Sequence, residues 1–246
     1  MCGRYALAAN AQDIALEFGI DGPPQAFLPA DWNIAPTKDV FFVNADDHEG
    51  VRRHLSVGSW GLVPQWSKDA KRAASTINAR VESVAEKPSF RSAFKSRRCL
   101  IPANGYYEWA TESGDFAPKQ PFYVYRNDGH LLAMAGLYEH WTDPTLRTTL
   151  TTTSVLTRES TGLIATIHHR MPILLPPERW AKWLSSDSLT SEQTDEYLDL
   201  LDLPQPEAGL AVRPVSTKVN SVRNNGPELL NEDKIEPETS LFTDFS

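Results

Sequence analysis

The sequence predicts a single α+β domain with an antiparallel, barrel-like β-sheet core and peripheral helices. Several runs rich in aromatic and β-branched residues are bounded by turn residues and follow one another without helical crossovers. This order favours antiparallel pairing over the strand–helix alternation of a parallel sheet. The predicted β-rich runs are 40–47, 99–109, 121–141, 147–157 and 171–176. Within the third run, Arg-Asn-Asp-Gly at 126–129 predicts a hairpin turn.

Capping signals predict two of the helices directly. Asn10 is a favourable N-cap for a short helix that Gly19 would end. Thr190 and Gln193 form a capping-box pattern in front of an acidic helix. A third helix is expected at 176–184, where two prolines precede the apolar positions.

The segment 85–98 predicts an amphipathic basic helix. Phe90 and Phe94 lie one turn apart on one face, and Arg91, Lys95 and Arg98 lie on another. The helix is part of a longer basic stretch. From 52 to 98 there are eleven Lys or Arg residues and three acids, a balance of +8.

The overall charge of −8 hides this local balance. From 185 to 246 there are thirteen acids and four bases, a balance of −9. Phosphate binding depends on the local field of a basic face, so the total does not exclude a nucleic-acid partner. The alternative is that these charges are spread over the surface and serve solubility alone.

Composition sets the broad class of the protein. At 246 residues, with 41% hydrophobic and 23% charged residues, the chain resembles a globular protein that buries a real core. We find no apolar run near the length of a membrane span and no signal-peptide pattern, so no membrane association is expected. Two cysteines cannot form a disulfide framework, which favours a reducing compartment, cytoplasmic or, in a eukaryote, nuclear. No metal site or cofactor is expected, and we expect a monomer.

The chain begins Met-Cys-Gly, and this start has a chemical consequence. Removal of Met1 would leave Cys2 with a free α-amine beside its thiol. Their ordinary pKa values are about 7.7–8.0 and about 8.5, so both are partly nucleophilic near neutral pH. The alternative is that cysteine is merely tolerated at position 2.

Candidate partners for such a nucleophile lie in separate motifs. Asn78 and Arg80 would share one face of an extended segment. Glu108 stands between Tyr107 and Trp109, where burial would disfavour its ionised form. Of the adjacent His168 and His169, which precede Arg170, one is a further candidate. Three more candidates are expected in loops, and the two tryptophans among them could stack on unpaired bases: Asn33, Trp60 and Trp66.

Taken together and in order, these motifs resemble the SOS-response-associated peptidase (SRAP) family. The resemblance runs from Cys2 to about Leu230. Its motifs are Met-Cys-Gly-Arg, W-N-I-A-P, W-G-L-V-P-x-W, I-N-A-R-V-E, Y-Y-E-W, I-H-H-R-M-P and the late R-P-V-S-T-K-V-N-S-V-R-N-N-G-P-E-L. It implies recognition of abasic sites in single-stranded DNA and covalent attachment through the N-terminal cysteine. It also implies a place in the DNA damage response, at the nucleoid of a bacterium or in a nucleus.

The resemblance assigns roles residue by residue. Cys2 matches the nucleophile, Asn78 the residue that holds the adduct, and Glu108 the catalytic carboxylate. The histidine directly after isoleucine is the functional one, which selects His168 over His169. DNA contacts are implied for Arg4, Trp66 with Pro64 in its loop, Arg80 and Arg170. The family name implies a peptidase activity that would remove Met1 or a short leader.

The implied chemistry requires an N-terminal cysteine. The sugar at an abasic site is mostly a closed hemiacetal, and opening it needs proton transfers suited to Glu108 and His168. The α-amine of Cys2 then condenses with the aldehyde to a Schiff base, and the adjacent thiol closes a five-membered thiazolidine. With an ordinary pKa near 6.5, His168 would exchange protons in both directions at neutral pH.

Two other readings remain open from the residues alone. A class II glutamine amidotransferase domain also exposes an N-terminal cysteine, and Asn104–Gly105 could serve as its oxyanion element. A non-covalent single-strand-binding module would not need Cys2 at the N-terminus. We expect one functional domain over 2–230 and an acidic, flexible tail over 231–246.

Overall fold

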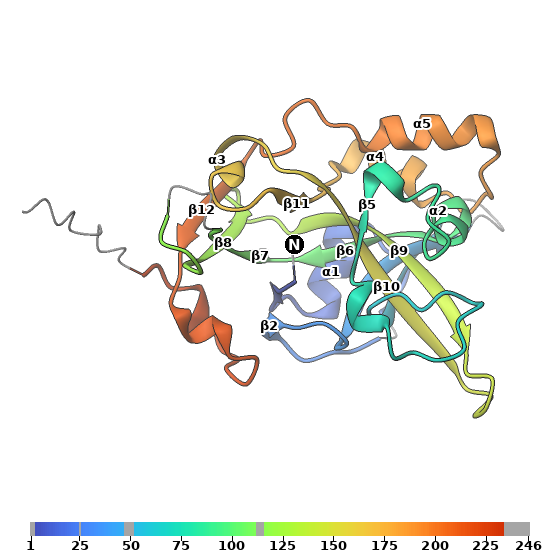
Figure 1. The fold of residues 1–246 in the computed structure, drawn as a ribbon, viewed down its shortest axis with the longest axis horizontal. Helices are drawn as coiled ribbons and strands as arrows, with labels where there is room; N and C mark the ends of the chain where they lie inside the picture. Colours follow the sequence, from blue (N-terminus) through green and yellow to red (C-terminus); the bar gives the residue numbers. More distant parts are fainter. Residues whose placement is uncertain (1–2, 25, 47–51, 112–115, 234–246) are drawn as a thin grey trace, which may run out of the picture.

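Five strands of the computed structural model close into a barrel (Figure 1). The structure describes residues 3–24, 26–46, 52–111 and 116–233. Strand β3 pairs with β4 and β6, β9 pairs with β6 and β10, and β10 closes the ring onto β4. The barrel strands are β3 (Asp39–Asp46), β4 (Arg52–Trp60), β6 (Arg98–Ala103), β9 (Leu132–Thr142) and β10 (Thr149–Glu159). The predicted barrel-like α+β architecture is therefore confirmed.

Two pairings depart from the expected antiparallel order. Strand β10 runs parallel to β4, with Thr152 opposite Ser59. It also runs parallel to the short strand β5 (Asn78–Arg80). The long chain between β4 and β10 has room to cross the barrel end, which a parallel pairing requires.

A second sheet of five antiparallel strands packs beside the barrel. Its order is β12-β8-β7-β1-β2. Gly105 begins β7, and a Cβ there would lie 2.5 Å from the carbonyl oxygen of Val124, so only glycine allows this approach of β8. The strands are β1 (Tyr5–Leu7), β2 (Asp31–Ile34), β7 (Gly105–Trp109), β8 (Pro121–Arg126) and β12 (Leu210–Pro214).

The predicted helix caps are confirmed. The Asn10 side chain accepts hydrogen bonds from two backbone amides of α1, and Gly19 ends the helix with φ of 58°. Thr190 and Gln193 form the complete capping box of α5. The remaining elements complete the described chain: α1 (Ala11–Phe18), η1 (Ala73–Ser75), η2 (Val81–Ser83), α2 (Arg91–Ser96), α3 (Gly162–Ala165), β11 (Arg170–Pro172), α4 (Pro177–Leu184), α5 (Ser191–Leu201), η3 (Thr217–Asn220) and η4 (Pro227–Leu230).

The hairpin predicted at Arg-Asn-Asp-Gly is wrong. The chain does turn there, with Gly129 at φ of 81° and its N–H bonded to the Arg126 carbonyl. However, β8 belongs to the second sheet and β9 to the barrel. The run 99–109 is divided in the same way between β6 and β7. The turn therefore carries the chain from one sheet to the other.

Arg98 does not lie on the basic helix expected at 85–98. Helix α2 ends at Ser96, and Arg98 begins β6 with only 2% of its surface exposed. Its guanidinium donates to five backbone carbonyls, and it lies 4.6 Å from the centroid of the Tyr197 ring. These carbonyls belong to Phe94, Lys95, Trp183, Ser185 and Asp187. Arg98 therefore joins the end of α2 to the end of α4 instead of facing solvent.

Replacing Arg98 by methionine is expected to destabilise the fold strongly. Several buried carbonyls would lose their donor, and each such loss costs on the order of 1–3 kcal/mol. Chemical denaturation of Arg98→Met should therefore show a much lower midpoint than wild type. Arg91→Met, on the exposed face of α2, is the matched control and should unfold like wild type. Equal midpoints for the two variants would contradict this role.

The C-terminal boundary of the domain stays a prediction. Within the described part of the chain, Glu232 bridges Val215, and the Asp233 N–H donates to the Pro214 carbonyl. Residues 234–246 of the expected tail lie outside the described residues. Among the helices that are described, none is long and apolar enough to cross a membrane.

Candidate functional site

The start of the chain enters the second sheet beside β7. Cys2 lies outside the described residues, but the stretch from Gly3 onward is described. The Arg4 carbonyl accepts a hydrogen bond of 2.9 Å from the Tyr107 N–H, and Tyr5 pairs with Tyr106. Arg4 is thus bonded to the residue directly before Glu108, and the same register continued by one residue would bring Gly3 level with Glu108.

Glu108 and His168 form a close, buried pair. Their side chains approach to 3.8 Å between Glu108 Oε2 and His168 Nδ1, and the two residues are 1% and 8% exposed. Burial raises the pKa of Glu108 to about 8, opposed by the positive charge of the N-terminus. Burial, aided by that same charge, lowers the pKa of His168 to about 4. At neutral pH this is a protonated acid beside a neutral imidazole, and not an ion pair.

The raised pKa of Glu108 confirms the expectation from its aromatic neighbours, whereas the ordinary pKa expected for His168 is wrong. The Arg170 N–H donates to His168 Nδ1 at 3.0 Å. Nδ1 also lies 3.2 Å from the Arg170 carbonyl oxygen, so it accepts from this backbone in one neutral tautomer and donates to it in the other. At neutral pH the lowered pKa leaves the His168 ring neutral, so it does not hold the extra proton of an imidazolium.

The two adjacent histidines have different surroundings. His169 is exposed, and its ring stacks on that of His168 at a centroid distance of 4.4 Å. Burial is the main cause that lowers the pKa of His169, and the charge of Arg80 adds to it. The structure thus brings His168, and not His169, against Glu108.

Strand β5 carries Asn78 and Arg80 on one side, as the alternation predicted. Asn78 is half-buried, Ala79 is fully buried, and Arg80 is exposed. The parallel pairing places Asn78 opposite Val155 and Arg80 opposite Thr157. Thr157 also pairs with Pro172 of β11, so β5 and the strand that follows the histidine pair lie on opposite edges of β10.

Arg170 is held inside the protein. It is 8% exposed and makes a bidentate ion pair with Glu82, at 2.6 and 3.0 Å. Its guanidinium also donates to the Thr157 carbonyl at 2.7 Å. The predicted contact of Arg170 with DNA stays a prediction, and Glu82 is a residue that the sequence reasoning did not identify.

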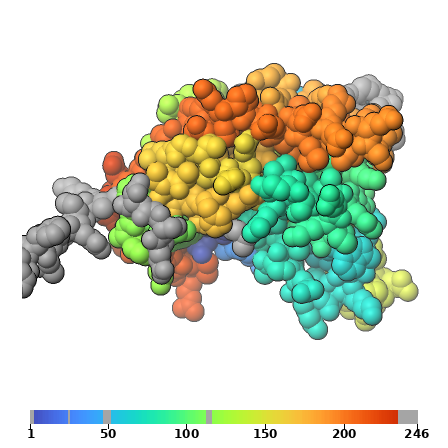
Figure 2. Space-filling model, turned by 45° about the horizontal axis from the view of Figure 1, so that its top comes forward, coloured from blue at the N-terminus to red at the C-terminus, as the bar shows by residue number. Residues whose placement is uncertain are grey.

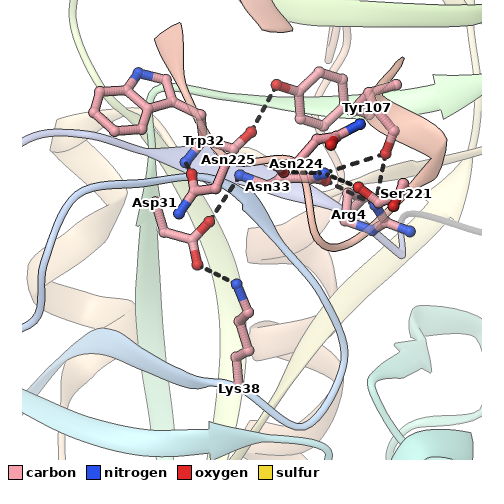
Figure 3. A network of polar contacts seen from close by, with 10 residues as sticks. Arg4, Asp31, Trp32, Asn33, Lys38, Tyr107, Ser221, Asn224 and Asn225 are labelled. Carbon is pink, nitrogen blue, oxygen red and sulfur yellow. Dashed lines mark hydrogen bonds and ion pairs between the residues drawn. The ribbon is translucent and has the colours of Figure 1, made fainter. Parts of the chain in front are cut away.

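The Arg4 side chain likewise has protein partners. It donates to Asn33 Oδ1 at 2.7 Å and to the Val219 carbonyl at 2.9 Å, and it lies over the Trp109 ring. Burial lowers the pKa of Arg4. The buried Asn33 amide in turn donates to the carbonyls of Ser221 and Asn224 (Figure 3).

Figure 3 also shows how the early and late motifs meet. The Trp32 N–H donates to Asn225 Oδ1 at 2.8 Å, and the Tyr107 hydroxyl donates to the Trp32 carbonyl at 2.7 Å. Asp31 accepts from the Asn33 N–H and from Lys38. This network fixes β1 and β2 against the segment 217–225, and so fixes the start of the chain.

The two tryptophans expected in loops have different surroundings. Trp60 is the last residue of β4, is fully buried, and donates to the Ile77 carbonyl, so it is a core residue and not a base-stacking platform. Trp66 is 66% exposed and donates to the Pro88 carbonyl at 3.3 Å. Pro64 is half-buried in the same loop. Trp66 alone of these presents a broad aromatic surface to solvent.

The basic stretch is only partly available to a partner. Arg53, Arg97 and Arg98 bind groups within the protein. The exposed members are Arg52, Lys68, Lys71, Arg72, Arg80, Lys87, Arg91 and Lys95. Figure 2 shows the segment from about 70 to 95 directly beside the segment that contains α3 and the histidine pair. Exposed cations therefore flank the candidate site.

The other polar groups singled out in the sequence can be placed as well. Asn104 Oδ1 accepts hydrogen bonds from the backbone amides of Ala8 and Ala9, at 2.6 and 3.3 Å, so this side chain holds the chain that follows β1. Across the described residues, no group of three or more His, Cys, Asp or Glu side chains could hold a metal ion.

These features define an α+β domain with a buried acid–imidazole pair beside exposed cations, the acid lying on the strand that pairs with β1. The chain belongs to the family described as SOS response associated peptidase (SRAP), which it matches over residues 1–222. It is 37% identical over 233 residues to the abasic site processing protein YoqW of Bacillus subtilis, covering 94% of this chain and 99% of that one. It is 33% identical over 206 residues to the abasic site processing protein HMCES of Xenopus tropicalis, covering 75% of this chain and 59% of that one.

Solved structures share the fold. A crystal structure of a protein from Bacteroides thetaiotaomicron matches with a TM-score of 0.79 and 27% identity, covering 95% of this chain and all of that one. A protein from Bordetella bronchiseptica matches with a TM-score of 0.71 and 25% identity, covering 87% of this chain and 100% of that one.

Proposed function

We propose that this protein processes abasic sites in single-stranded DNA by bonding covalently to them through Cys2 after loss of Met1. The observation that carries the proposal is the buried, protonated Glu108 beside His168, level with the stretch that leads to Cys2. The names of the relatives support abasic sites as the substrate. Such a protein acts where damaged DNA is found, at a nucleoid or in a nucleus.

The bond-forming steps require only the α-amine and thiol of Cys2. The amine adds to the open-chain aldehyde and loses water, which gives an imine. The thiol sulfur then bonds to the imine carbon, and its proton passes to the nitrogen to complete the thiazolidine. Since both groups belong to one residue, the second attack is intramolecular and strongly favoured. Self-removal of Met1 would make the same site a peptidase acting once on its own chain.

The surrounding side chains divide the proton transfers. Glu108 is protonated at neutral pH, so it can donate to the ring oxygen as the hemiacetal opens and to the hydroxyl that leaves on imine formation. His168, neutral at the same pH, is proposed to orient the sugar through Nε2, because its Nδ1 contacts the Arg170 backbone. Asn78 is proposed to hold the adduct.

Binding to the DNA strand would come from exposed groups around the site. Arg80 is exposed at the end of β5 and can meet a phosphate. Trp66 can stack on or block a base next to the lesion. Arg4 and Arg170, which already bind protein groups, are proposed to reach DNA through their remaining donor capacity. Placing an abasic sugar at a fixed chain start favours a single strand over continuous duplex.

The purified protein is expected to form a one-to-one, denaturant-resistant adduct with an abasic single-stranded oligonucleotide. Intact mass spectrometry should give the mass of the protein without Met1 plus that of the DNA minus one water. A matched oligonucleotide with an intact base is the control and should give no adduct. Binding that disappears on denaturation would show a non-covalent single-strand-binding protein instead.

A further inference from the structure

The ion pair between Glu82 and Arg170 joins two segments that carry the proposed site. Glu82 lies in η2, two residues after Arg80, and Arg170 begins β11, two residues after His168. Both carboxylate oxygens of Glu82 accept from Arg170, which is the strongest geometry available to this pair. The two residues are far apart in the chain, so the contact is a cross-link between β5–η2 and β11.

Strand β5 is a short strand whose middle residue, Ala79, is buried in the core. It is three residues long and pairs with β10 along one edge. On the other side of the contact, Arg170 is buried, and its backbone N and carbonyl oxygen lie 3.0 and 3.2 Å from His168 Nδ1. A side chain that ties Arg170 to the segment after β5 therefore helps to hold β5 in place relative to the segment that carries His168.

The same carboxylate also cancels charge at the DNA-facing surface. The Glu82 side chain is half-exposed, whereas that of Arg170 is not. Hydrogen bonding from Arg170 lowers the pKa of Glu82, so the carboxylate stays ionised at neutral pH. A single strand that approaches Arg80 meets a neutral pair at Arg170 instead of a second cation.

We propose that Glu82 is a positioning residue for the abasic-site reaction, which holds β5 and Arg170 in register while it limits the attraction of the site for DNA phosphate. This inference rests on the proposed function. It predicts that the two effects of removing the carboxylate have opposite signs, a result that general destabilisation would not produce.

Glu82→Gln is expected to slow the reaction and to tighten DNA binding. The adduct-forming rate at saturating abasic DNA should fall about tenfold, because small displacements of positioned groups cost rate steeply. Binding of undamaged single-stranded DNA should tighten, and its log–log salt slope should steepen by up to about 0.7, since the charge of the buried Arg170 is no longer neutralised beside Arg80.

Two variants complete the test. Glu86→Gln removes an equal charge from an exposed position in the same segment, and it should change neither the saturating rate nor the salt slope. Glu82→Asp keeps the carboxylate one methylene shorter, and it should restore the wild-type salt slope and part of the rate. Hydrogen exchange at the β5 amides should be faster in Glu82→Gln than in Glu86→Gln.

The outcomes separate this inference from the function on which it rests. A wild-type protein that forms no adduct would contradict the proposed function. An adduct-forming wild type with a Glu82→Gln variant that matches Glu86→Gln in rate, salt slope and β5 exchange would overturn the role of Glu82 alone. Equal losses of rate and DNA affinity in Glu82→Gln, without rescue by aspartate, would also overturn it, because they would indicate a purely structural residue.

Discussion

Cys2→Ala is expected to abolish the denaturant-resistant adduct and to leave non-covalent binding of single-stranded DNA largely unchanged. Alanine also follows Met1 as a small residue, so the variant keeps a free α-amine once Met1 is removed. That amine can still form an imine with the open-chain sugar, but no thiol is present to close the ring. The imine hydrolyses, and a stable product should appear only when borohydride reduces it in place.

Cys99→Ala is the matched control for this experiment. Cys99 is the other cysteine of the chain, is fully buried, and has a thiol pKa raised by that burial. Because an inert thiol takes no part in the chemistry, this variant should form the adduct as wild type does. A stable adduct from Cys2→Ala without reductant would remove the thiazolidine from the mechanism.

Local signals in the sequence predicted local structure well. The caps at Asn10 and Thr190 and the stop at Gly19 act within a few residues, so tertiary contacts have little chance to override them. The pairing of strands into sheets could not be predicted in the same way. The turn after Arg126 is real, yet β8 and β9 separate, because the choice of partner depends on both sheets at once.

The candidate site shows the same division. The raised pKa of Glu108 could be predicted from its aromatic neighbours, because burial follows from the local strand. The lowered pKa of His168 could not, since the groups that bury it come from the folded chain. Motif resemblance supplied the residue, and only the structure supplied its protonation state.

The long-range polar partners of the buried arginines could not be predicted from the sequence. Arg98 stands among cations and was expected on the surface, but its partners are backbone carbonyls, which look alike in every sequence. Arg170 and Glu82 are separated by 88 positions, and Arg4 and Val219 by 215. A charged residue beside a motif therefore indicated the neighbourhood of a site, but not whether its charge was already used.

Glu108→Gln is expected to slow adduct formation at least about 100-fold, the usual contribution of a positioned general acid. The wild-type rate should rise as the Cys2 amine loses its proton, and it should fall again as pH exceeds about 8, where Glu108 ionises. Glutamine matches the shape of the protonated carboxyl but has no acidic proton. The residual rate of the variant should therefore rise with pH and reach a plateau, without the descending limb.

Stability measurements separate this loss from unfolding. The native pKa of Glu108 is raised above its unfolded value of about 4.3, so the native state alone holds the proton between that pH and about 8. The contribution of Glu108 to stability is therefore fully present below pH 4.3 and is lost as pH rises through this window. Glu108→Gln has no such proton to lose, so at pH 8 and above it should melt no lower than wild type while reacting far more slowly. If the variant instead kept the descending limb of the rate profile, the acid that ionises there would not be Glu108.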